Sequence, residues 1–190
     1  EGLRTRVLAM GGLVEQQVIR AMEGLQTGDI ALIEQVIATD RQVNRHEVEL
    51  DEACNHVIAK RQPAAVDLRM IMTVVKTITD LERIGDEAKK IAKMAKRIHE
   101  ADAGFVPRIE MRHAAGLAAN MLHKALDAFA RLDVHAAAGV VREDAEVDRE
   151  FKAIMRQLIT FMMEDPRTIS SSIEILFIAK AIERIGDHAK

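Results

Sequence analysis

The stretch Glu82-Arg83-Ile84-Gly85-Asp86 occurs a second time as Glu183-Arg184-Ile185-Gly186-Asp187. The two copies are 101 positions apart in a chain of 190 residues, so the sequence predicts one structural unit used twice. Each copy places a glutamate and an aspartate four residues apart, and on an α-helix that spacing brings both carboxylates to one face. Two adjacent acids repel each other unless a cation or a hydrogen-bond donor lies between them, so the repeated pair is the best indication of function.

Apolar residues recur every three or four positions around the first copy, a spacing that predicts an amphipathic helix. The second copy carries the same stripe. The stripes consist of Met70, Val74, Thr77, Leu81, Ile84, Ala88, Ile91, Ala95 and Ile98 in the first copy, and of Ile175, Ile178, Ile182, Ile185 and Ala189 in the second.

Turn-forming residues divide the chain into six predicted helices. Asp29 and Asp133 are expected to cap two of them, because an aspartate side chain accepts hydrogen bonds from free backbone N–H groups. The strongest break, at Ala103 to Pro107, predicts a boundary between a first three-helix bundle, 1–104, and a second, 105–190. The first helix ends at about residue 27, and the others span about 29–62, 64–101, 108–132, 133–164 and 166–190, the last being cut short relative to its counterpart.

The composition is that of a helical globular protein, with 48% hydrophobic and 30% charged residues. Trp and Tyr are absent and ten Met are present, so the core is expected to be aliphatic. The net charge of -3, without a long run of Lys or Arg, argues against nucleic acid as a partner. No apolar run approaches the roughly 20 residues that a membrane-spanning helix needs. Cys54 is the single cysteine, so no internal disulfide forms and a reducing cytosol is expected.

A second set of acids interrupts apolar seams in the predicted helices 29–62 and 133–164. Asp40 and Asp144 stand where apolar residues precede and follow at helical spacing, and Asn44 and Asp148 come four residues later. A charge removed from water costs several kcal/mol unless it is paired. Asp40 and Asp144 are therefore each expected to have a partner that compensates the charge, and a metal ion is one kind of partner that could do so.

The heights of the acids on neighbouring helices also match. Asp40 lies 23 residues before Pro63, and Glu82 lies 19 residues after it. At 1.5 Å per residue the two side chains differ in height by about 6 Å, roughly one helical turn. In an antiparallel hairpin the acidic pairs of both helices therefore come together.

Oxygen ligands without Cys or an obvious His partner favour a hard cation such as Mg, Mn, Ca or iron. Because Asn44 stands where the other half has Asp148, the first half has one charge fewer and is predicted to bind metal more weakly. The candidate ligands are Asp40, Asn44, Glu82 and Asp86 in the first half, and Asp144, Asp148, Glu183 and Asp187 in the second.

Salt bridging is the alternative to metal binding. Arg83 and Arg184 repeat beside the acids, as do Lys89 and Lys190 one turn further on, and exposed ion pairs contribute little stability. The repeated glycines of the two motifs are expected to allow close helix packing. A helical metal-storage protein or a metal-dependent enzyme on the same bundle is a further alternative.

No enzyme signature is present. The chain has no Gly-rich phosphate loop and no nucleophile elbow. Glu110 to His113 is the only E-x-x-H, whereas a carboxylate-bridged di-iron oxidase needs two. The sequence therefore predicts a protein that is not an enzyme.

These motifs resemble those of the PhoU family, and the resemblance covers nearly the whole chain. It rests on the doubled E-R-I-G-D motif together with an upstream D-x-x-x-D or D-x-x-x-N in each half. The matching segments are Asp40–Asn44, Arg61–Pro63, Asp67–Arg69 and Asp80–Asp86 in the first half, and Asp144–Asp148, Glu164–Pro166 and Ile182–Ala189 in the second.

The resemblance implies an all-α fold of two tandem three-helix bundles related by a pseudo-twofold repeat. It implies metal sites at the candidate positions, holding multinuclear iron or zinc clusters, or Mg or Mn, with Asn44 departing from the usual acid. PhoU-like proteins are cytoplasmic, peripheral to the membrane and form homodimers or larger oligomers. They connect the phosphate ABC transporter, through its ATPase subunit, to a PhoR-type sensor histidine kinase and repress the phosphate-starvation response.

Overall fold

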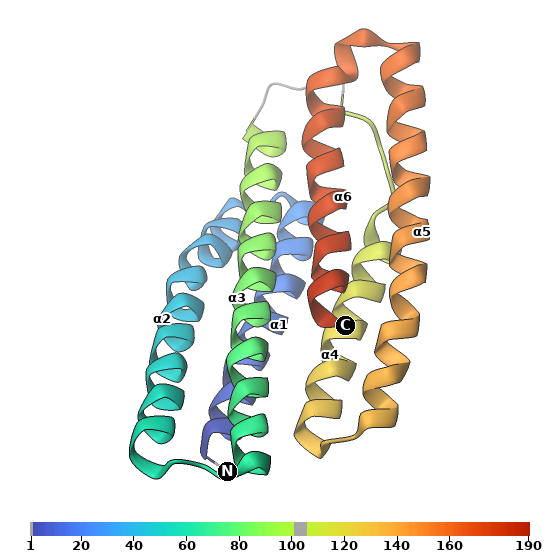
Figure 1. Cartoon of the computed structure of the whole chain (residues 1–190). Coiled ribbons are helices and arrows are strands. Elements are labelled where there is room, and N and C mark those ends of the chain that lie inside the picture. Colours follow the sequence, from blue (N-terminus) through green and yellow to red (C-terminus); the bar gives the residue numbers. More distant parts are fainter. Residues whose placement is uncertain (1, 101–105) are drawn as a thin grey trace.

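The computed structural model describes residues 2–100 and 106–190, which form six α-helices and one short 3-10 helix (Figure 1). The helices form two sets of three that lie side by side, and strands are absent from the described ranges. Their bounds are α1 Gly2–Thr27, α2 Ile30–Arg61, α3 Ala65–Glu100, α4 Arg112–Arg131, α5 Val134–Glu164, η1 Pro166–Thr168 and α6 Ile169–Ala189.

Helices α2 and α5 begin at the capping residues that the sequence predicts. The Asp29 carboxylate accepts a hydrogen bond from the backbone N–H of Leu32 at 3.1 Å, and the Asp133 carboxylate accepts one from Ala136 at 2.9 Å. Gly28 precedes the first cap with a φ of 69°, a left-handed conformation that glycine adopts without strain. Both turns are short, so consecutive helices run antiparallel (Figure 1).

Helices α1, α2 and α3 pack on one another, as do α4, α5 and α6, and the two sets meet where α3 packs on α6 and α1 packs on α4. The prediction of two tandem three-helix bundles is confirmed. In Figure 1, α3 and α6 lie next to each other at the junction of the bundles. Because each carries one copy of the repeated motif, both motifs lie close to this junction.

The core is aliphatic, as the composition predicts. Val43, Leu50 and Cys54 on α2 are fully buried, and Val147 and Leu158 occupy the corresponding seam on α5. The apolar seams of both helices therefore face the core, and the acids within them face it as well.

The start of α4 differs from the prediction. It was expected near residue 108 and lies at Arg112, after the N-cap residue Met111. Just before the helix, the Glu110 carboxylate accepts a hydrogen bond from the backbone N–H of Arg112 at 2.7 Å. Val106 and Ile109 pack against the core from the non-helical segment that precedes the helix. The predicted break at 103–107 lies partly in 101–105, outside the described residues. At the other end, α6 stops at Ala189 rather than at Lys190.

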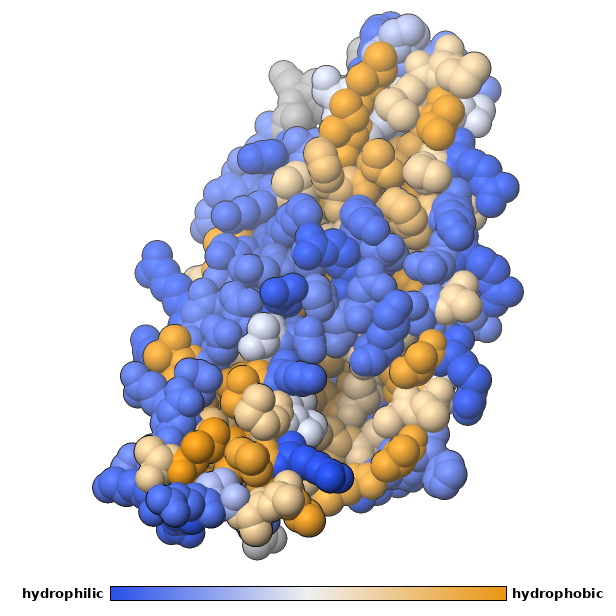
Figure 2. Space-filling view, in the orientation of Figure 1, coloured by the Kyte–Doolittle hydropathy of each residue, from blue (hydrophilic) through white to orange (hydrophobic). Residues whose placement is uncertain are grey.

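The surface divides into polar and apolar regions. Figure 2 shows polar side chains across the middle of the visible face and apolar ones toward both ends, including the end where α5 turns into α6. No described helix combines the length and the apolar character that crossing a bilayer requires. The exposed large apolar residues of these two helices are Val134, Val141, Ile159, Met163, Ile169, Ile173 and Phe177.

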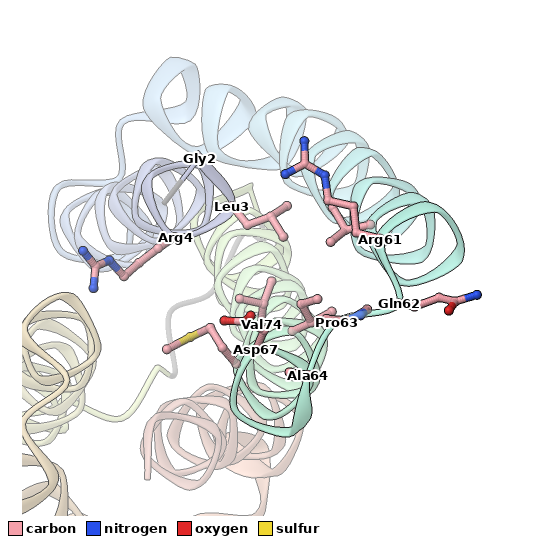
Figure 3. Close-up of a pocket in the computed structure, with 12 residues that line it drawn as sticks. Gly2, Leu3, Arg4, Arg61, Gln62, Pro63, Ala64, Asp67 and Val74 are labelled. Atoms are coloured by element: carbon pink, nitrogen blue, oxygen red, sulfur yellow. The ribbon is translucent and has the colours of Figure 1, made fainter.

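A groove of about 760 Å³ opens at the end of the first bundle, between the start of α1 and the turn from α2 to α3 (Figure 3). Leu3, Pro63 and Val74 form part of its apolar lining, and Arg4 extends away from Leu3 and Val74. Its lining residues include none of the predicted ligands. The acidic rows therefore form a separate candidate site.

Candidate metal centre

In the first bundle, α2 and α3 bring two predicted ligands to the same height. Asp40 is only 3% exposed, and its Oδ2 accepts a hydrogen bond from Lys89 Nζ at 2.6 Å. The same ammonium lies 3.7 Å from Asp86 Oδ1. Lys89 and Asp86 are on α3 and Asp40 is on α2, so one positive charge bridges the two helices. The hydrogen bond that Lys89 donates to Asp40 is the main reason that the pKa of Lys89 is raised.

The second bundle repeats this arrangement between α5 and α6. Lys190 Nζ donates to an Oδ atom of Asp144, which is 9% exposed, and to Asp187 Oδ1 at 2.8 Å. The hydrogen bonds with Asp144 and then with Asp187 raise the pKa of Lys190. Lys89 and Lys190 are 101 positions apart, as are the two motifs. The ion pairs that the sequence offered as an alternative to metal are therefore present at both lysines.

The motif glutamates have different surroundings in the two halves. Burial raises the pKa of Glu82, and the negative charges of Asp86, Glu47 and Asp40 raise it further. Glu183 is buried, and its Oε2 lies 2.6 Å from Lys180 Nζ. The first half has Thr79 at the position of Lys180, so it lacks this second ammonium.

Glu47 lies close enough to the first cluster for its charge to act on Glu82 and Asp86, although sequence reasoning did not select it. It is half-buried on α2, and its pKa is raised by burial and then by the charges of Asp51 and Asp86. The signal was present, since Glu47 interrupts the same seam as Asp40. Phe151 occupies the matching position of the second half, so comparing the repeats concealed it. With Glu47, each half has four carboxylates.

The structure does not join all eight predicted ligands. Asn44 is exposed and Asp148 is half-buried, and within 2–100 and 106–190 neither forms a hydrogen bond or ion pair with another predicted ligand. Among the described residues, no group of three or more His, Cys, Asp or Glu side chains is assembled as a metal site. In each half, the carboxylates that the structure does bring together are two aspartates that both pair with one lysine.

Two buried oxygen atoms test whether these residues fit a cation. Asp40 Oδ1 and Asp144 Oδ1 are buried, and neither has a hydrogen-bond partner in the described part of the chain. Buried polar atoms are nearly always satisfied by protein, water or an ion. An unpartnered carboxylate oxygen beside further carboxylates is the donor type that hard divalent cations prefer. The donor chemistry of these residues fits a cation held between the paired helices, although among the described residues no three of them converge on one position.

The two motif glycines differ in the space around them. A Cβ built at Gly85 would lie 3.2 Å from both Gln17 Oε1 and Val43 Cγ1, so close helix packing is confirmed there. A Cβ at Gly186 would lie 3.5 Å from Val147 Cγ1 and 3.6 Å from Asp144 Oδ1, which are ordinary contacts.

The comparisons with known proteins agree with this geometry. The family model described as PhoU domain matches residues 7–95 and 111–190, one match in each bundle. The phosphate-specific transport system accessory protein PhoU of Escherichia coli is 47% identical over 193 residues, which cover all of this chain and 78% of that protein. The PhoU homolog of Pseudomonas putida is 47% identical over 192 residues, covering all of this chain and 74% of its own length.

Solved structures give the same result. The crystal structure of PhoU from Pseudomonas aeruginosa matches with a TM-score of 0.95 and 48% identity, covering all of this chain and 90% of that one. The phosphate transport system regulatory protein PhoU from Streptococcus pneumoniae, at 24% identity and a TM-score of 0.91, shares the fold over 99% of this chain and 88% of its own. The relatives are named as accessory proteins, in agreement with the prediction that the chain is not an enzyme. The chain belongs to the PhoU family.

Proposed function

We propose that the chain is a metal-binding cytoplasmic regulator of phosphate uptake and signalling. It links the phosphate ABC transporter, through the ATPase subunit, to a PhoR-type sensor histidine kinase at the membrane surface, and it keeps the phosphate-starvation response off when phosphate is plentiful. The observation that carries this proposal is the 47% identity, over the whole chain, to proteins named as phosphate-specific transport system accessory proteins.

The metal would act by fixing helix faces. A cation between Asp40 and the carboxylates of α3 would hold α2 and α3 in one register, and a cation at Asp144 would do the same for α5 and α6. A partner that recognises a helix face needs such a register and requires no catalysis. Carboxylate donors favour manganese, magnesium or iron over zinc, which prefers thiolate and imidazole.

The regulatory role is tested in cells that lack their own PhoU-family gene and carry a phosphate-starvation reporter. Wild-type chain is expected to repress the reporter in high phosphate. Replacing Glu82, Asp86, Glu183 and Asp187 together by Ala is expected to derepress it. The matched control replaces four exposed glutamates outside the clusters, Glu34, Glu52, Glu146 and Glu164, and is expected to repress normally. Unchanged repression by the first variant would contradict a regulatory role for the clusters.

The partner assignment is tested by affinity capture from phosphate-replete cells, with and without a chelator. We expect the transporter ATPase and the sensor kinase to be captured, and the chelator to reduce capture. Capture of neither protein would contradict the adaptor role. Light scattering tests the proposed homodimer, which has twice the chain mass of 21.1 kDa.

A further inference from the structure

One lysine side chain occupies the equivalent bridging position in each bundle. Lys89 Nζ lies between Asp40 on α2 and Asp86 on α3. Lys190, the residue that follows α6, has its Nζ between Asp144 on α5 and Asp187 on α6. Each ammonium thus contacts one carboxylate from each of two helices. A divalent cation joining the same helices would draw on the same carboxylates, and its positive charge would repel an ammonium held between them.

The lysines satisfy these carboxylates only in part. Asp40 Oδ1 and Asp144 Oδ1 have no hydrogen-bond partner within the described ranges, although Lys89 and Lys190 hold the other oxygen of each aspartate. In the first half, the single charge of Lys89 is shared between the carboxylates of Asp40 and Asp86. A divalent cation brings twice the charge and takes several oxygen ligands at once.

Both lysine side chains are also partly accessible to solvent. The side chain of Lys89 is 28% exposed and that of Lys190 is 37% exposed, so each ammonium reaches solvent by rotating its flexible stem. Of the aspartates they pair with, Asp40 and Asp144 are buried and cannot follow, whereas Asp86 and Asp187 are themselves partly exposed. The cation can therefore be exchanged while the buried carboxylates stay in place.

We propose that Lys89 and Lys190 are built-in counter-ions that occupy the metal position in the metal-free protein and are displaced when a metal ion binds. This inference rests on the proposed metal-binding function and adds a competing residue to each site. The lysine holds the buried aspartate neutralised between metal-binding events, so the bundle stays folded without metal. Because a site occupied by its own lysine is available for only a fraction of the time, the apparent metal affinity is lower by that fraction.

The first test uses the wild-type protein, without any substitution that might affect folding. Metal-free protein is treated with an amine-acetylating reagent, with and without saturating Mn²⁺, and labelling of each lysine is followed by mass spectrometry. Mn²⁺ is expected to speed the labelling of Lys89 and Lys190 by about tenfold, since the ammonium groups are released. Lys96 is the internal control, because it forms a 2.7 Å ion pair with Glu34 away from the clusters and its labelling is expected not to change. Unchanged or slower labelling of Lys89 and Lys190 would overturn the proposal.

The second test measures Mn²⁺ affinity by calorimetry in Lys89→Met and Lys190→Met, with Lys96→Met as the control. Each site variant is expected to bind Mn²⁺ about tenfold more tightly in its own half, and the control is expected to bind like wild type. If wild type binds Mn²⁺ and the site variants bind no more tightly, the counter-ion role is overturned and the metal site stands. If neither wild type nor the variants bind Mn²⁺, the metal site itself is overturned, and this inference with it.

Discussion

At the scale of individual residues, the stability of the site depends on a buried carboxylate and on the lysine that pairs with it from the neighbouring helix. Asp40 is nearly inaccessible to solvent, and Lys89 is its ion-pair partner. Removing one partner of a buried pair costs more than the pair itself contributes, because a charge remains without compensation. Lys89→Met is therefore expected to lower the free energy of unfolding of metal-free protein by about 1–3 kcal/mol in urea denaturation. Adding Asp40→Asn is expected to recover most of this loss, and a double variant no more stable than Lys89→Met would contradict the pairing.

Glu47 gives the pH dependence of the first cluster. Burial and neighbouring acids raise its pKa, so the folded state binds its proton more tightly than the unfolded state does. The ionised side chain then destabilises the fold above its raised pKa, and this effect disappears as the pH falls to the ordinary glutamate range. Glu47→Gln is expected to be more stable than wild type at pH 7 in the absence of metal, with the advantage lost near pH 4.5. If Glu47→Gln and wild type differ in free energy of unfolding by the same amount at both pH values, the pKa of Glu47 is not raised by its surroundings.

At the level of the helices, close packing depends on one of the two motif glycines. Gly85→Ala is expected to lower the free energy of unfolding by about 1–2 kcal/mol, because the new Cβ would press against Gln17 and Val43. Gly186→Ala meets only ordinary contacts and is expected to raise stability by up to about 1 kcal/mol, as Ala is the better helix former. Urea denaturation of both variants measures the difference, and equal effects would contradict it.

The helices show which features a sequence reveals. Periodicity predicted the two stripes, and Asp29 and Asp133 predicted two helix starts, since these signals act over a few residues. The start of α4 was placed four residues too early, because the non-helical segment before Arg112 has no turn signal in the sequence that marks its end, and the helix has no side-chain cap. Glu47 was missed because the search relied on the repeat, and the repeat is broken there by Phe151.

For the molecule as a whole, the residue after each motif aspartate reaches across the junction of the bundles. Glu87 accepts from Arg184 at 2.9 Å, and His188 Nδ1 lies 3.1 Å from Asp80 Oδ1. Each candidate site is therefore one residue away from a contact with the other half. No sequence pattern predicted these pairs, because they depend on how α3 and α6 pack.

The two halves also differ in the charged groups around their candidate sites, and this difference changes the expected order of their metal affinities. The absent acid at Asn44 predicted weaker metal binding in the first half. Glu47 restores that charge, and the second half has Lys180 beside Glu183 in addition to Lys190. We therefore expect the first half to bind metal at least as tightly as the second. Titrating Asp40→Ala and Asp144→Ala separately measures each half, and clearly tighter binding by Asp40→Ala would contradict this ranking.

Equilibrium dialysis of chelator-treated protein against Mn²⁺ tests most directly whether the mirrored carboxylate clusters hold cations. Wild type is expected to bind Mn²⁺ at saturable sites in both halves. Asp40→Ala is expected to lose the sites of the first half, Asp144→Ala those of the second, and the double variant all of them. Wild type without saturable binding, or a double variant that binds as much as wild type, would show that these carboxylates serve only the ion pairs with Lys89 and Lys190.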